Sequence, residues 1–291
     1  MQASPLKLDP IHLAIFESAP SQKGEIGILF FHGVGRRGRD FAPLFNSFAH
    51  DRPLWAVDAR GHGASDRANG SYYIKDHAQD AIGVLEKITQ SGTTPVVIFG
   101  HSMGALQAMA AATLRPDLVR GLILEDPPGP GFLATLETNP YQHLFLAMQR
   151  FAGCPLPTAE LARQLAEVQL PGATSSTSIR LGDVRDMASL RLSASCLKQV
   201  DPAVYDPLLA KNWLLGLDFD TMLKGIRCPV LLLAGEESRG GMLPVTEAER
   251  IASGVADCLW VRFPNTGHLI HWTATEACLA SVHSFLESLE R

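Results

Sequence analysis

One short segment constrains the fold of this chain more than any other: Gly100-His101-Ser102-Met103-Gly104. It follows an apolar run at 95–99 and precedes an alanine-rich stretch at 105–112 that favours a helix. A buried strand, a tight turn and a helix in that order hold the serine hydroxyl at the apex of the turn. The start of the helix presents free N–H groups that stabilise a developing anion. The pattern predicts Ser102 as a nucleophile, and the alternative is a plain strand-to-helix turn.

Apolar runs alternate with helical patterns along the chain. We expect strands within the following ranges: 6–8, 12–16, 27–31, 54–58, 95–99, 121–125, 229–234 and 259–263. Helical patterns occupy 40–49, 73–90 and 274–289. This alternation predicts an α/β fold, a mostly parallel eight-stranded sheet with helices on both faces.

The interval 127–222 breaks the alternation. It begins with Pro127-Pro128-Gly129-Pro130-Gly131, which continues neither a strand nor a helix, and then becomes mainly helical. A Gly/Ser/Thr-rich gap interrupts the helical pattern at 172–178. We therefore expect 127–222 to form a helical cap over the C-terminal edge of the sheet, and 1–126 with 223–291 to form the core domain.

Composition and charge exclude several classes of protein. Hydrophobic residues make up 46% of the chain and the net charge is −5, with no basic run longer than Arg36-Arg37, so we expect no nucleic-acid partner. The five cysteines lack the spacing of a zinc site or a disulfide framework and favour a reducing compartment. The N-terminus lacks a signal-peptide pattern and no apolar stretch is long enough to span a membrane, so we expect a cytoplasmic protein without a membrane partner.

Three further motifs give the chain a family resemblance. They are His32-Gly33-Val34-Gly35, the stretch Asp58-Ala59-Arg60-Gly61-His62-Gly63-Ala64-Ser65-Asp66, and Gly267-His268 after the last strand. With the Ser102 turn, they resemble the α/β-hydrolase superfamily, in the form of a serine hydrolase with a helical cap. The resemblance implies a triad in the chain order serine, acid, histidine, with no metal and no organic cofactor.

Among ten histidines, His268 is the predicted base. It lies in a loop directly after the apolar run 259–263, which places it over the C-terminal edge of the sheet, near Ser102. The other candidates are less favoured. We expect packing or backbone-fixing roles for His271, His101, His32 and His62.

The position of the carboxylate in the predicted triad differs from the pattern that is commoner in the family. Where many relatives keep an aspartate after the seventh strand, this chain has Ser238, with Glu236 and Glu237 nearby but out of register. Some relatives, including haloalkane dehalogenases and certain lactonases, place the acid at the end of the sixth strand, where this chain has Asp126. Strand alternation puts Glu125 on the opposite side. We predict Asp126 as the acid, with Glu237 or Glu236 as the alternative acids. The other interpretation of Asp126 is a residue that anchors its own loop by hydrogen bonds to the local backbone.

Two backbone N–H groups are predicted to form the oxyanion hole. One belongs to Met103, which follows the nucleophile, and the second to Val34, with Gly35 as an alternative. An ordinary turn at the end of a strand is the other interpretation of residues 33–35. The nearby Arg36-Arg37-Gly38-Arg39 could meet an acidic group of a substrate, although a solvated loop is the favoured interpretation.

The cap segment is rich in large apolar side chains, most of which should pack against the core while a few line a pocket. The residues are Phe132, Leu133, Leu136, Tyr141, Leu144, Phe145, Met148, Phe151 and Trp213. Such a pocket favours a small hydrophobic ester or lactone over a sugar or a phosphate. The sequence thus predicts a serine hydrolase that works through an acyl-enzyme. A carbon–carbon bond hydrolase or lyase, and a non-catalytic small-molecule binding protein, are the alternatives.

Overall fold

The structure is a computed structural model that describes residues 3–18, 26–90, 95–171 and 177–290. Its central sheet has eight strands within these ranges, in the spatial order β1-β2-β4-β3-β5-β6-β9-β10. The bounds are β1 (Ala3–Leu8), β2 (Ile11–Glu17), β3 (Ile28–Phe31), β4 (Leu54–Val57), β5 (Val96–His101), β6 (Val119–Glu125), β9 (Val230–Ala234) and β10 (Cys258–Arg262). The pairs β1–β2 and β2–β4 are antiparallel and the other pairs are parallel, which confirms the predicted fold class.

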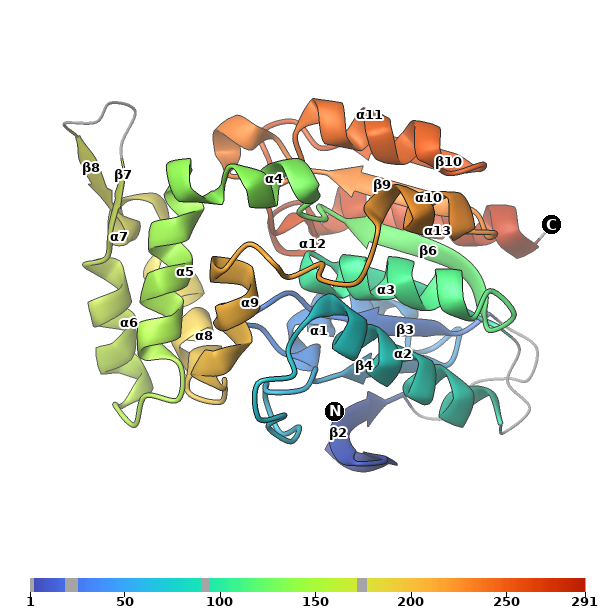
Figure 1. Ribbon diagram of the computed structural model, residues 1–291, viewed down its shortest axis with the longest axis horizontal. Coiled ribbons are helices and arrows are strands. Elements are labelled where there is room, and N and C mark those ends of the chain that lie inside the picture. The colour runs from blue at the N-terminus through green and yellow to red at the C-terminus, as the bar shows by residue number, and fades with distance from the viewer. Residues whose placement is uncertain (1–2, 19–25, 91–94, 172–176, 291) are drawn as a thin grey trace.

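Helices cover both faces of this sheet, so its central strands are buried on both sides (Figure 1). On one face the core includes side chains from α2 (Ile74–Thr89), α3 (Met103–Leu114), α10 (Phe219–Gly225) and α11 (Val245–Gly254). On the other face it includes α1 (Ala42–Phe48) and α13 (Thr275–Glu290). Neighbouring strand residues such as Ile98 and Phe99 belong to opposite cores, because side chains alternate along a strand.

Residues 127–222, which we call the cap, contain most of the remaining helices. They are α4 (Pro130–Ala134), α5 (Pro140–Phe151), α6 (Thr158–Ala166), α7 (Leu181–Val184), α8 (Met187–Leu197) and α9 (Asp206–Leu209). In Figure 1 the cap helices α5, α6 and α8 lie at the left, beyond the ends toward which β6 and β9 point. Their apolar side chains join the same buried cluster as α2 and α3.

Two features of this region were not expected from the sequence. A two-stranded antiparallel ribbon, β7 (Gln169–Pro171) with β8 (Ser178–Arg180), flanks the Gly/Ser/Thr-rich gap, most of which (172–176) lies outside the described residues. The helix α10 crosses the expected boundary at 222 and packs against α3 of the core.

Candidate active site

Ser102 occupies the sharp turn between β5 and α3. Its backbone angles, φ 55° and ψ −116°, are unusual for a residue with a side chain, and its side chain is almost buried. A Cβ atom on Gly100 would overlap the backbone of Gly104 and Ala105, and one on Gly104 would overlap the carbonyl of Phe31. The turn therefore needs glycine on both sides of the serine, and strand and helix meet too closely for any larger residue.

His268 and Asp126 lie together at the same edge of the sheet. The Nδ1–H of His268 donates to Oδ2 of Asp126 over 2.6 Å. The carboxylate is fully buried and also accepts hydrogen bonds from the N–H groups of Met242 (2.7 Å) and Gly235 (3.0 Å). These backbone donors fix the orientation of the carboxylate, and the carboxylate in turn fixes the imidazole with its Nε2 free for another partner.

The two alternative acids lie elsewhere in the same region. Glu237 is exposed at the start of a short 3₁₀ helix, Glu237–Arg239. The carboxylate of Glu236 accepts from the N–H of Asn265 (2.8 Å) and from the hydroxyl of Ser238. Within the described residues neither glutamate hydrogen-bonds to His268, so the structure brings Asp126 to this histidine.

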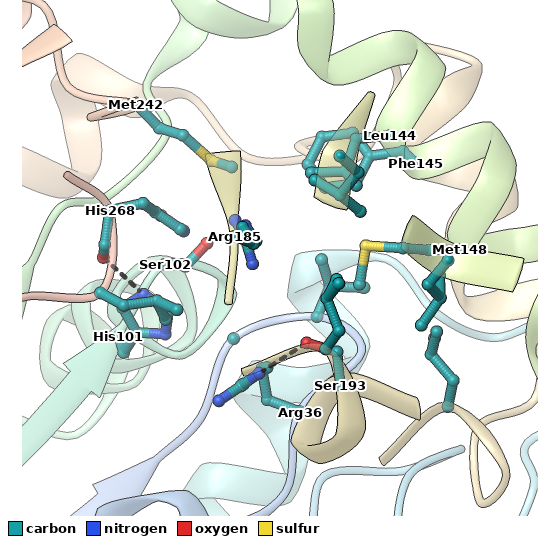
Figure 2. A pocket seen from close by; sticks show the side chains of 17 residues that line it. Arg36, His101, Ser102, Leu144, Phe145, Met148, Arg185, Ser193, Met242 and His268 are labelled. Atoms are coloured by element: carbon teal, nitrogen blue, oxygen red, sulfur yellow. Dashed lines mark hydrogen bonds between the residues drawn. The ribbon is translucent and has the colours of Figure 1, made fainter. Parts of the chain in front are cut away.

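Ser102 and His268 both line one pocket, to which the core and the cap contribute (Figure 2). No hydrogen bond joins the hydroxyl of Ser102 to His268 among the residues that the structure describes. Such bonds are often long in the absence of substrate and tighten when it binds. The arrangement places a serine and a histidine at a common cavity, with a buried carboxylate behind the histidine.

A second histidine–carboxylate pair lies beside the first. His271, in α12 (Ile270–Thr273), donates from Nδ1–H and from its backbone N–H to the carboxylate of Glu125, over 2.7–3.0 Å. Both side chains are buried, at 1% and 0% exposure. The sequence predicted a packed His271 but not its pairing with Glu125. The signal for this pair was the two adjacent acids at 125–126 together with two histidines, His268 and His271, only three residues apart.

His101 packs between the two pairs. Its ring centroid lies 4.5 Å from that of His268 and 5.1 Å from that of His271, and its Nε2–H donates to the backbone carbonyl of His268 over 3.0 Å. Burial lowers the pKa of His101 well below its usual value, and the neighbouring His268 and His271 lower this pKa further. A neutral His101 therefore supports the loop that carries His268.

His32 and His62 fix the loops that face Ser102. Each accepts a backbone N–H at Nε2, from Ala59 (2.9 Å) and Gly35 (3.0 Å) respectively, and each donates its Nδ1–H to a backbone carbonyl. Burial lowers the pKa of His32 to about 4 and that of His62 to about 3, so both rings are neutral near pH 7. Asp58 acts in the same way and accepts from two backbone N–H groups.

The loop after β3 lies against the Ser102 turn. A Cβ atom on Gly33 would come within 3.1 Å of the Cβ of Ser102, so the backbone of residues 33–34 approaches the serine closely. The N–H of Gly35 already donates to His62, which leaves Val34 as the free candidate of the two. Met103 is the first residue of α3, where the N–H has no partner inside the helix.

The pocket walls are largely apolar and come from the cap. They include Leu144, Phe145, Met148, Leu165, Leu181, Leu190 and Leu197. Two arginines interrupt this lining, Arg36 from the core and Arg185 from the cap. Arg36 differs from the favoured expectation of a solvated loop, because it is only 8% exposed and forms an ion pair with Asp40. The sequence offered no signal for Arg185, whose place depends on how the cap folds.

Neither a metal cluster nor a membrane-spanning helix occurs in the part of the chain that the structure describes. No group of three or more histidine, cysteine, aspartate or glutamate side chains in it could hold a metal ion. None of its helices is long and apolar enough to cross a bilayer.

Comparison with known families completes the description of the site. A model of the alpha/beta hydrolase family matches residues 28–280, which include all the residues of the site described above. This chain belongs to the alpha/beta hydrolase family. The match spans the core and the cap alike, in agreement with the architecture of the sheet and with the turn at Ser102.

Two curated relatives match most of this chain at low sequence identity. The chain is 24% identical over 269 residues to the 2-(acetamidomethylene)succinate hydrolase of Mesorhizobium japonicum, with 90% of this chain and 88% of that protein covered. It is 27% identical over 271 residues to an sn-1-specific diacylglycerol lipase of Mus musculus, with 89% and 80% covered. Among solved structures, an E-2-(acetamidomethylene)succinate hydrolase superimposes with a TM-score of 0.76 at 21% identity, and covers 98% of this chain and 99% of its own. The enol-lactonase of Burkholderia xenovorans LB400 has a TM-score of 0.72 at 17% identity, with 98% and 100% covered.

Proposed function

We propose that this protein is a serine hydrolase that cleaves a hydrophobic carboxylic ester or lactone through an acyl-enzyme. The observation that carries the proposal is the 2.6 Å hydrogen bond from His268 to the buried Asp126, with His268 and Ser102 facing one pocket. Membership of the alpha/beta hydrolase family supports a hydrolase in general. Relatives and structural neighbours that are named lipase, esterase and enol-lactonase support ester or lactone cleavage.

In the proposed reaction Ser102 attacks the substrate carbonyl while Nε2 of His268 takes its proton. Asp126 orients His268 and stabilises its cationic form. The N–H groups of Met103 and Val34 bind the oxyanion of the tetrahedral intermediate. His268 then gives the proton to the leaving alkoxide. Water, activated by the same histidine, attacks the acyl-enzyme and releases the acid.

The cap serves this reaction by enclosing the acyl group. Its leucine, phenylalanine and methionine side chains provide the apolar wall of the pocket, while the core (1–126 and 223–291) carries the triad. An apolar wall excludes water around the developing charge and strengthens the hydrogen bonds to the oxyanion. In this proposal, residues 127–222 therefore select the substrate and the core performs the chemistry.

Pre-steady-state release of 4-nitrophenol from esters of short and medium acyl chains tests this function. A burst that matches the enzyme concentration, absent in Ser102→Ala, is expected for an acyl-enzyme at Ser102. Ester turnover without a burst requires product analysis, because slow acylation also removes the burst. Absence of both burst and turnover across all chain lengths would contradict ester hydrolysis, and would favour carbon–carbon bond cleavage, a lyase reaction or ligand binding without turnover.

A further inference from the structure

Arg185 carries a positive charge into the pocket without a partner. It lies between α7 and α8, and its backbone N–H donates to the carbonyl of Leu181. Within the described residues its guanidinium forms no hydrogen bond, and no carboxylate lies within the 4.0 Å of an ion pair. Its nearest acid in sequence, Asp186, is exposed and caps α8 through Ser189 instead. Figure 2 shows Arg185 among the side chains that line the cavity, which also include Ser102.

The other arginine of the pocket is already neutralised. The guanidinium of Arg36 pairs with the carboxylate of Asp40, and both side chains are buried. Its Nη1 also lies 3.4 Å from the hydroxyl of Ser193. Arg36 and Asp40 together thus add no net charge to the cavity, and the charge of Arg185 stays unbalanced.

An unpaired cation that is partly withdrawn from solvent is costly, and a folded chain normally compensates it. Burial lowers the pKa of Arg185, Tyr141 and Asp186 offset part of this shift, and the nearby charge of Arg36 adds to it. An arginine nevertheless stays ionised at neutral pH. The walls around it are largely apolar and no carboxylate pairs with it in the described residues, so a natural counter-ion is one that enters with the substrate.

We propose that Arg185 binds a carboxylate of the substrate, so that the acyl compound cleaved at Ser102 carries one free carboxyl group. This inference rests on the function proposed above and specifies its substrate class. The planar fork of a guanidinium matches the two oxygens of a carboxylate, and the single unbalanced charge in the cavity matches one such group. The apolar leucine and phenylalanine walls then enclose the carbon chain between the carboxylate and the scissile carbonyl.

Binding without chemistry provides the first test. Isothermal titration with valerate and with its neutral isostere valeramide is performed on the wild type, Arg185→Gln and Arg191→Gln. Arg191 is the matched control, because it is exposed on the neighbouring α8 and does not line the pocket. We expect valerate to bind the wild type and Arg191→Gln, and to lose about 100-fold in affinity with Arg185→Gln. Valeramide should bind all three proteins equally weakly.

Hydrolysis provides the second test. The substrates are the mono-4-nitrophenyl esters of succinate, glutarate and adipate, each beside the neutral ester of equal chain length, with a buffer blank to subtract intramolecular cyclisation. The wild type should prefer the acidic ester, and Arg185→Gln should lower kcat/KM for that ester about 100-fold more than for the neutral ester. Arg185→Lys, which keeps the charge but not the fork, should fall between them. Melting curves establish that the variants are folded.

Two results would overturn the assignment of Arg185. One is valerate binding that is absent from the wild type or equal in wild type and Arg185→Gln. The other is a loss of kcat/KM that is the same for acidic and neutral esters. Failure of the function itself gives a different pattern, because Arg185-dependent binding of valerate would then persist although no ester gives turnover or a burst.

Discussion

Two histidine–carboxylate pairs lie side by side at one edge of the sheet and share the same chemistry. Asp126 accepts from His268, and its neighbour Glu125 accepts from His271. His268 lines the pocket with Ser102, whereas His271 is buried at 1% exposure and its Nε2 has no hydrogen-bond partner in the described structure. Both pairs join a histidine to a carboxylate, but only the pair with His268 has access to the cavity.

The geometry of β6 explains this division. Glu125 is the last residue of the strand, whereas Asp126 lies just beyond it with a left-handed φ of 48°, and the two carboxylates bind different histidines. Glu125 ties α12 to the sheet beside Phe41, whose ring lies 5.0 Å from that of His271. We infer that the inner pair, Glu125 with His271, stabilises the fold. The outer pair, Asp126 with His268, acts on the substrate. The predictions below separate these two roles.

Removal of the outer acid should have the largest effect. Asp126→Asn keeps the shape of the side chain but loses the charge and the preferred tautomer of His268, so kcat should fall by about 10³–10⁴. Steady-state kinetics on a 4-nitrophenyl ester measures this loss, and urea unfolding checks the fold. A fall of less than tenfold would show that another carboxylate orients His268.

Removal of the inner acid should instead cost stability. Glu125→Gln breaks a fully buried pair, and we expect the free energy of unfolding to fall by about 3–5 kcal/mol. The kcat of the molecules that remain folded should change little at low temperature. Glu276→Gln on the exposed surface of α13 is the control. An unchanged urea midpoint, or a loss of kcat as large as that of Asp126→Asn, would contradict the structural role.

Acid tests a third set of histidines, the neutral His32 and His62 that fix the loops facing Ser102. His32 and His62 have lowered pKa values of about 4 and about 3, while an unfolded histidine titrates near 6.5. Above that value neither state is protonated, so the stabilisation is complete. As the pH falls from about 6.5 toward the folded pKa, only the unfolded state binds the proton, and each histidine costs about 1.4 kcal/mol per pH unit.

Denaturant unfolding between pH 7 and pH 5 measures this dependence. His62→Asn removes one titrating group and should reduce the slope by about one proton. His143→Asn, at an exposed position in the cap, is the matched control for the substitution itself. A stability that does not change over this interval would mean that the buried rings are already protonated in the folded protein.

The alternative acid should give the smallest effect. Glu237 is exposed and takes no part in the hydrogen bonds of Asp126 and His268 in the described structure, so Glu237→Gln should leave kcat within about twofold of the wild type and stability within about 0.5 kcal/mol. The same kinetic and urea measurements serve as the check. A strong loss here, with a mild one in Asp126→Asn, would reverse the assignment of the acid.

The sequence predicts the core of this molecule well because its strands are local apolar runs with clear boundaries. The placement of Ser102 and His268 at one sheet edge follows from where these runs end, and so does the place of Asp126 just beyond the end of β6. The pairing of Glu125 with His271 escaped prediction because it needs the packing of α12 against β6 in three dimensions. Arg185 escaped for a similar reason, since it reaches the pocket only through the folding of the cap, where no alternation guides the chain.

The backbone conformation of Ser102 affects which sequences a selection for thermal stability would favour. Its left-handed φ is tolerable for glycine and costs a residue with a side chain about 1–3 kcal/mol. Under the proposed mechanism, the most stable protein and the active one are thus different sequences at this position. A laboratory screen that scores only survival at high temperature would enrich Ser102→Gly and discard the activity, so each round must also select for turnover.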